Sequence, residues 1–120
     1  MSGTENRPPG ILEEQLRLGT GFGSADGTRV LRALAGLAPH LAGWNPEQVE
    51  LEVSVKEREG RDRRVTLEAR LAGWPRIVAT SHQDDLDRAL TEVRDDLIRQ
   101  IEDAKTRRDP HKHRTPGKRT

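Results

Sequence analysis

The amino-acid sequence predicts a two-layer α+β domain of the order β-α-β-β-β-α, with both helices packed on one face of a four-stranded sheet. Three observations lead to this fold class. Residues 48–57 and 64–71 alternate apolar and polar side chains, which is typical of half-buried strands. Residues 26–41 and 81–108 repeat apolar side chains at three- and four-residue steps, which is typical of helices that cover a sheet. Short turn segments join the later strands, so we expect an antiparallel meander.

Residues 11–18 are predicted to form the first strand, because their leucines lie at even spacing. The glycine-rich segment 19–27 follows, where a phosphate-binding loop would lie between a strand and a helix. Its glycines do not have the GxGxxG spacing and the lysine of a P-loop is missing, so we interpret it as a turn. Asp26 or Thr28 is expected to cap the helix at 26–41.

The second half of the chain predicts two more turns, a short strand and a long helix. Gly60 is expected to take the positive φ that the turn between the alternating strands needs. Residues 77–79 predict the last strand. Ser81 is expected to begin the long helix, with Asp84 as its partner in a capping box, and the helix is expected to end at Asp109.

The near-neutral net charge of +1 hides an acidic body and a basic end. Residues 1–104 carry 14 Lys and Arg against 19 Asp and Glu, whereas residues 105–120 carry 7 Lys and Arg against a single Asp. A basic arm of this kind is typical of proteins that bind polyanions. We therefore expect a folded domain at 11–108 between two disordered tails, 1–10 and the basic 109–120.

Composition argues against an enzyme. The 120-residue chain has no cysteine, hence no thiol nucleophile, and no apolar run approaches the roughly 20 residues that a membrane span needs. His111 and His113 lack carboxylates or thiols around them for a metal site. No cluster of Ser, His and carboxylate side chains suggests catalysis. We expect no cofactor, no metal and no small-molecule substrate.

Nucleic-acid binding remains the best-supported function class. The chain has no Tyr, and its single Phe, Phe22, lies in a turn, which disfavours base stacking on the sheet. The remaining mode of nucleic-acid binding is recognition of RNA phosphates by Arg and Lys side chains. One group of cations lies at the predicted hairpin turn: Arg58, Arg61, Arg63 and Arg64. A second group runs from the last helix into the basic arm: Arg99, Lys105, Arg107, Arg108, Lys112 and Arg114.

The last half of the chain resembles the ribosome hibernation-promoting factor family, also called protein Y or ribosome-associated translation inhibitor. The segment Ala79-Thr-Ser-His-Gln-Asp-Asp-Leu-Asp-Arg-Ala-Leu90 is similar to the family pattern of a small residue, an acidic pair, a hydrophobic residue and alanines. Leu97-Ile-Arg-Gln-Ile101 and the basic stretch 105–114 follow as in the family. The order of the predicted elements also agrees, so the resemblance covers about residues 11 to 114. Asp96 departs from the pattern, because the family usually has Lys there.

This resemblance implies a cytoplasmic factor that sits on the small ribosomal subunit in the channel for messenger and transfer RNA, blocks translation and preserves idle ribosomes in stationary phase or stress. It implies a divergent short form without the separate C-terminal dimerisation domain of the long form, monomeric off the ribosome. By position, it assigns the contacts to ribosomal RNA to the second group of cations, Arg99 to Arg114. Two alternatives stay open: a protein-interaction module whose basic tail aids solubility, and a generic domain of the double-stranded-RNA-binding type.

Overall fold

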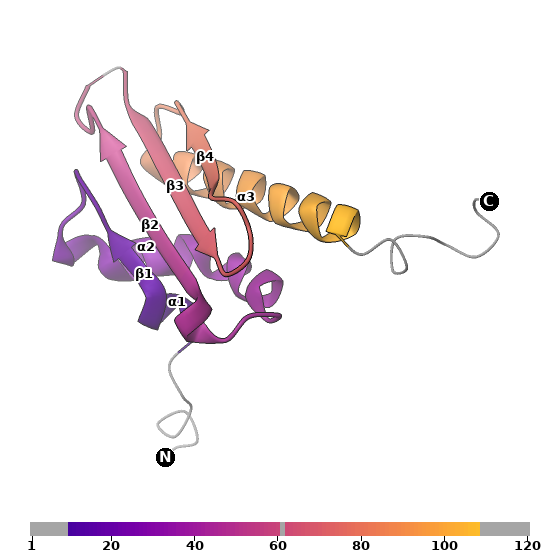
Figure 1. The fold of residues 1–120 in the computed structure, drawn as a ribbon. Helices are drawn as coiled ribbons and strands as arrows, with labels where there is room; N and C mark the ends of the chain where they lie inside the picture. Colours follow the sequence, from indigo (N-terminus) through magenta and orange to yellow (C-terminus); the bar gives the residue numbers. More distant parts are fainter. Residues whose placement is uncertain (1–9, 61, 109–120) are drawn as a thin grey trace, which may run out of the picture.

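A computed structural model describes residues 10–60 and 62–108, and it confirms the mixed α+β fold (Figure 1). The helices lie on one side of a four-stranded sheet whose strands follow chain order. The strands are β1 (Leu16–Leu18), β2 (Val49–Lys56), β3 (Arg64–Leu71) and β4 (Ile77–Ser81). The helices are α1 (Ile11–Gln15), α2 (Gly27–Leu34) and α3 (Leu86–Arg108), with 3₁₀ turns η2 (Ser24–Asp26), η3 (Ala35–Leu41) and η4 (Pro46–Gln48). Residues 1–9 of the predicted N-terminal tail 1–10 and the whole predicted C-terminal tail 109–120 lie outside the described residues.

The meander predicted for the three later strands is confirmed. β2 pairs antiparallel with β3, and β3 with β4, so that Val53, Leu67 and Ala79 lie side by side across the sheet. β1 runs parallel to β2 instead, because α2 carries the chain back across one face between them. β1 and β4 are therefore the two edges of the sheet.

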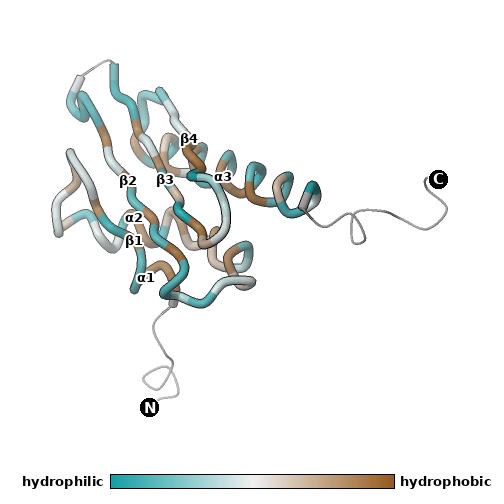
Figure 2. Tube along the Cα trace, in the orientation of Figure 1, coloured by the Kyte–Doolittle hydropathy of each residue, from teal (hydrophilic) through white to brown (hydrophobic). Residues whose placement is uncertain are grey.

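The core lies between the sheet and α3. The inward residues of β2 and β3 alternate with exposed ones, as period-2 patterning requires. α3 faces them with a stripe of fully buried side chains at three- and four-residue steps. The hydropathy colours show this apolar stripe on the side of α3 that faces the strands (Figure 2). This stripe consists of Leu90, Val93, Leu97 and Ile101.

The prediction of a strand over residues 11–18 is wrong for its first five residues. Ile11 to Gln15 form the short helix α1, in which the Glu14 amide donates to the Gly10 carbonyl and Leu12 is buried. Only Leu16–Leu18 pair with β2. The consecutive Glu13 and Glu14 are good helix formers, and burial of Leu12 in the core outweighs the even spacing of the leucines.

The predicted helix over residues 26–41 is present but changes its geometry midway. α2 gives way at Ala35 to the 3₁₀ turns of η3. Gly36 weakens the α-helix and Pro39 has no amide hydrogen for the Ala35 carbonyl, so the tighter turn takes over. The helix contributes Leu34, Leu37 and Leu41 to the core nonetheless.

Ser81 does not begin the last helix. It is the final residue of β4, paired with Val65, and its side-chain oxygen donates to Glu92 on α3. α3 begins five residues later, where the Asp85 carboxylate accepts a 2.9 Å hydrogen bond from the Asp87 amide. The capping residue is thus Asp85, and the predicted box of Ser81 with Asp84 is wrong, because pairing with β3 holds Ser81 in the sheet.

Truncation of Leu97 tests whether the contact of α3 with the sheet dominates stability. Leu97→Ala removes a fully buried side chain from the middle of the stripe and should lower the free energy of unfolding by about 3 kcal/mol. The measurement is urea unfolding followed by circular dichroism. Val78→Ala is the control, because Val78 is 39% exposed and should cost less than about 1 kcal/mol. Equal losses in the two variants would contradict this account.

Candidate nucleic-acid interface

The two predicted groups of cations lie at opposite ends of the molecule. The β2–β3 turn is at one end of the strands, and the C-terminal half of α3 reaches the other end, beside the β3–β4 turn (Figure 1). Strands of eight residues separate these ends by about 25 Å. The members of the two groups that the structure describes therefore do not form one continuous surface.

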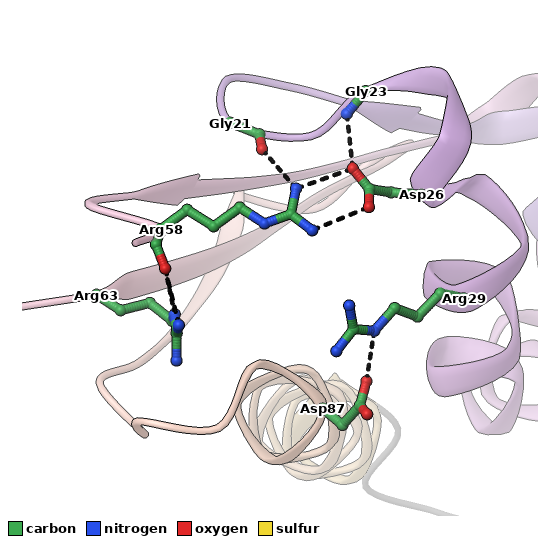
Figure 3. A network of polar contacts seen from close by, with 7 residues as sticks. All are labelled: Gly21, Gly23, Asp26, Arg29, Arg58, Arg63 and Asp87. Atoms are coloured by element: carbon green, nitrogen blue, oxygen red, sulfur yellow. Dashed lines mark hydrogen bonds and ion pairs between the residues drawn. The ribbon is translucent and has the colours of Figure 1, made fainter. Parts of the chain in front are cut away.

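The hairpin cations are mostly engaged in holding the turn itself. Arg58 forms two hydrogen bonds with the Asp26 carboxylate, at 2.9 and 3.0 Å, and a third with the Gly21 carbonyl (Figure 3). Arg63 donates twice to the Arg58 carbonyl. Arg64 is exposed on the outer face of the sheet, and Arg61 lies outside the described residues. Of these cations, Arg58 is thus paired with a carboxylate and Arg63 is bonded to a backbone carbonyl, whereas Arg64 remains exposed.

The same network explains the glycine-rich segment. Gly21 takes a φ of +87°, and Asp26 accepts a 2.8 Å hydrogen bond from the Gly23 amide. The segment is a turn, as expected, and a carboxylate occupies the place that an anion would take in a phosphate loop. Asp26 does sit at the N-cap position of α2, but its side chain makes no capping bond to that helix. Asp26 instead ties the segment to the hairpin.

The turn between β2 and β3 differs from the prediction in one residue. Glu57, not Gly60, takes the positive φ, at 55°. The Gly60 amide donates to the Glu57 carbonyl at 2.9 Å, so the chain reverses directly after β2 ends. Glu57 accepts a conformation that glycine adopts more readily, because the bonds of Arg58 and Arg63 hold the turn around it.

On α3, Arg99 and Arg107 are exposed, and Asp103 lies between them at four-residue steps. They therefore share one face of the helix. Arg99 forms an ion pair with Asp96, and its side chain remains 68% exposed. Arg107 has no hydrogen bond or ion pair within the part of the chain that the structure describes. Both guanidinium groups can reach an external anion.

Lys105 lies on a different side of α3 and is engaged within the protein. Its amine donates to the His40 carbonyl at 3.0 Å and to the Glu102 carboxylate at 3.3 Å, and it lies 5.8 Å from the centre of the Trp44 ring. His40 Nδ1 also contacts Glu102, at 2.7 Å. Hydrogen bonds from His40 and then Lys105 lower the pKa of Glu102. This cluster joins η3 to α3, so Lys105 serves mainly to hold these two elements together through hydrogen bonds.

Of the remaining predicted contact residues, Arg108 is the last residue of α3, and its side chain is not among those that the structure describes. Lys112 and Arg114 also lie outside the described residues. The structure thus brings Arg99 and Arg107 together on one face and separates Lys105 from them.

An aromatic pair lies at the same end of the molecule and was missed in the sequence. The rings of Trp44 and Trp74 are 4.9 Å apart and nearly perpendicular, at 87°. The Trp44 indole donates to the Ala72 carbonyl at 3.3 Å, which fixes the β3–β4 turn against the loop after η3. The sequence does hold one indication of this pair: the residues around the two tryptophans are similar. Each tryptophan follows Ala-Gly and precedes a proline within two residues.

The described part of the chain holds no group of three His, Cys, Asp or Glu side chains that could bind a metal ion. None of the helices in residues 10–60 and 62–108 is long and apolar enough to cross a bilayer. The described surface at this end of the molecule carries exposed guanidinium groups beside an aromatic pair, and such groups can contact an anion and a flat ring.

Comparison with known proteins assigns no family. No protein-family model matches the chain, and no curated protein matches it. The fold is similar to a solved structure described as a ribosomal subunit interface protein from Coxiella burnetii. The two chains are 13% identical with a TM-score of 0.49, over 76% of this chain and 97% of the other. Similarity at this level carries no functional assignment.

The Asp26–Arg58 contact predicts a specific loss of stability in acid. Hydrogen bonds from Arg58 and then from the Gly23 amide lower the pKa of Asp26 from 3.8 to about 2. Because the folded value lies below the unfolded one, the charged carboxylate stabilises the fold above pH 4 and this contribution disappears as the pH falls from about 4 to about 2. Asp26→Asn should therefore be less stable than the wild type at pH 6, and the difference should shrink below pH 4.

Urea unfolding at pH 6, 4 and 3 measures this difference. Asp84→Asn is the control, since Asp84 is exposed and has no hydrogen bond or ion pair among the described residues. It should match the wild type at each pH. A deficit in Asp26→Asn that stays constant from pH 6 to pH 3 would refute the role given to the carboxylate charge.

Proposed function

We propose that the chain is a ribosome-binding factor of the hibernation type, which occupies the decoding channel of the small subunit and inhibits translation. The observation that carries the proposal is the outward face of α3, where Arg99 and Arg107 are exposed and beyond which the basic segment 109–120 continues. The resemblance of residues 79–90 and 97–101 to the hibernation-factor pattern supports the choice of ribosomal RNA as the polyanion.

In this proposal Arg99, Arg107 and Arg108 contact phosphates of ribosomal RNA, with Lys112 and Arg114 extending the contact. Lys105 contributes indirectly, because its bonds to His40 and Glu102 hold the end of α3 against η3. Each phosphate contact releases condensed counterions, so binding should weaken steeply with salt. The protein acts by occupying space and performs no catalysis, in the cytoplasm and under stress or in stationary phase.

Co-sedimentation with purified ribosomes through a sucrose cushion, at 50 and 200 mM salt, tests the proposal. Pelleting with the small subunit at the lower salt and its steep decline at the higher salt are the expected results. A chain that stays in the supernatant at the lower salt would refute it and favour the protein-interaction module. Equal binding to free duplex RNA would refute it in favour of a generic double-stranded-RNA-binding domain.

Reversal of the exposed cations should remove ribosome binding. In Arg99→Glu with Arg107→Glu, two attractive phosphate contacts become repulsive, so binding at low salt should fall by about tenfold or more. The matched control is Arg32→Glu with Arg88→Glu, which makes the same charge change at exposed positions of α2 and α3. Both double variants must keep the helical circular dichroism of the wild type. A similar loss of binding in both would show that only net charge matters.

Replacement of Asp96 should strengthen binding. Asp96→Lys frees Arg99 from its ion pair and adds a cation on the neighbouring turn, so affinity should rise by about three- to tenfold with a steeper dependence on salt. Asp84→Lys makes the same change of net charge at the start of α3 and serves as control. If Asp96→Lys binds no better than Asp84→Lys, Arg99 does not lie at the interface.

A further inference from the structure

A groove of about 180 Å³ separates the β3–β4 turn from the last turns of α3. Its first wall consists of Trp74, Pro75, Arg76 and Ile77. Its second wall consists of Gln100, Asp103, Ala104 and Arg107, from α3. An aromatic ring, two guanidinium groups and two polar side chains thus face one hollow. Sites for drug-sized ligands have volumes of about 300 to 1,000 Å³. This groove is smaller, so it suits a single flat group.

The aromatic wall is held in place before any ligand arrives. The Trp74 amide donates to the Leu71 carbonyl at 2.9 Å, and Gly73, with a φ of +84°, makes the tight turn that this bond closes. The perpendicular Trp44 ring supports Trp74 from the protein side. Trp74 is half-buried, so part of its ring still lines the groove. A ring positioned in this way loses little conformational entropy when another ring stacks on it.

Charges on both walls indicate the rest of the ligand. Arg107 is exposed on the α3 side, and Arg76 on the β4 side is 59% exposed while it contacts Glu68 at 3.3 Å. Between them, the Asp103 carboxylate can accept hydrogen bonds, and Gln100 has a side-chain carbonyl besides its committed amide. Cations beside an aromatic surface, with hydrogen-bond acceptors at its edge, match a nucleotide, in which a sugar joins the base to the phosphate.

We propose that this groove binds one unstacked nucleotide of single-stranded RNA, with the base against Trp74 and Pro75 and the phosphates on Arg107 and Arg76. The inference rests on the proposed function, and it names a contact of that interface that goes beyond phosphate binding. It is compatible with the expectation that base stacking on the sheet is disfavoured, because the proposed stacking surface lies at the end of the sheet rather than on its face.

A peptide strand is the competing occupant, since β4 is an edge of the sheet and Val78 on it is exposed. Such a strand would need the outward carbonyl groups of β4 for its hydrogen bonds. Gln100 already donates to the Val78 carbonyl at 3.0 Å. This bond occupies a carbonyl group of β4 that lies next to the groove, so the groove favours a nucleotide over an added strand.

Intrinsic fluorescence provides a local probe, because the chain has only two tryptophans and both belong to this pair. The full chain is titrated with an unstructured six-nucleotide oligo(A) RNA and, separately, with an RNA duplex of the same length. The oligo(A) should quench the fluorescence in a saturable way, and the duplex should quench it at least about tenfold less well, because its bases are already stacked. Equal quenching by both, or none by oligo(A), would overturn the proposal.

Variants separate stacking from general charge. Trp74→Leu keeps an apolar wall but removes the ring, and it should weaken binding of fluorescently labelled oligo(A) about tenfold, as loss of a stacked base does. Arg107→Gln should lower the slope of log affinity against log salt by about 0.7, the value for one phosphate of a single strand. Arg88→Gln, on the same helix and about 28 Å away, is the control and should leave both quantities unchanged.

A second variant guards against loss of structure in Trp74→Leu. Trp74→Phe keeps an aromatic ring and should restore most of the affinity, with urea unfolding measured for both. If Trp74→Leu is folded and binds oligo(A) as tightly as the wild type, the nucleotide site is refuted. The ribosome proposal fails separately: it is refuted when the wild type does not pellet with ribosomes, whereas the groove alone is refuted when the wild type pellets with ribosomes but oligo(A) does not quench its fluorescence.

Discussion

The burial of one apolar face of the sheet beneath α3 is the constraint on which the remaining structure depends. The stripe of Leu90, Val93, Leu97 and Ile101 has 0% exposure, and it can be buried only if the helix lies along the strands. That placement carries the end of α3 to the β3–β4 turn. The opposite side of the helix, with Arg99 and Arg107, is then left toward solvent. Positions that face RNA in our proposal are consequences of this hydrophobic contact.

Carboxylates pair with several of the described cations, but the pairs differ in kind. The Arg58–Asp26 pair is partly buried, with both side chains less than 30% exposed, and it connects two segments far apart in the chain. The Arg99–Asp96 pair joins residues on one exposed turn. Exposed pairs contribute about 0 to 1 kcal/mol, so a phosphate can displace Asp96 at little cost. In our proposal, the acidic body therefore restrains RNA binding only where its carboxylates share a surface with the cations.

The predicted contact residues differ in what holds their side chains within the protein. Arg99 and Arg107 lie on one face of α3, which follows from helical periodicity, a local property. Lys105 and Arg58 looked equivalent to them in the sequence, yet each is engaged by a residue more than 30 positions away. The contact between the two tryptophans could not be predicted from the sequence for the same reason, because Trp44 and Trp74 meet only after the sheet and η3 are packed.

The sequence by itself determined the fold class, the bounds of β2 and β3 to within a residue, and the apolar stripe of α3. These follow from alternation and helical periodicity, which act over a few residues. Only the tertiary structure decided that residues 11–15 are helical, that Ser81 ends a strand, and that Glu57 rather than Gly60 reverses the chain. At each of these positions, burial or hydrogen bonds to distant residues outweigh a local preference worth about 1 kcal/mol or less. A window of neighbouring residues does not contain these distant contacts, so it cannot predict their effect.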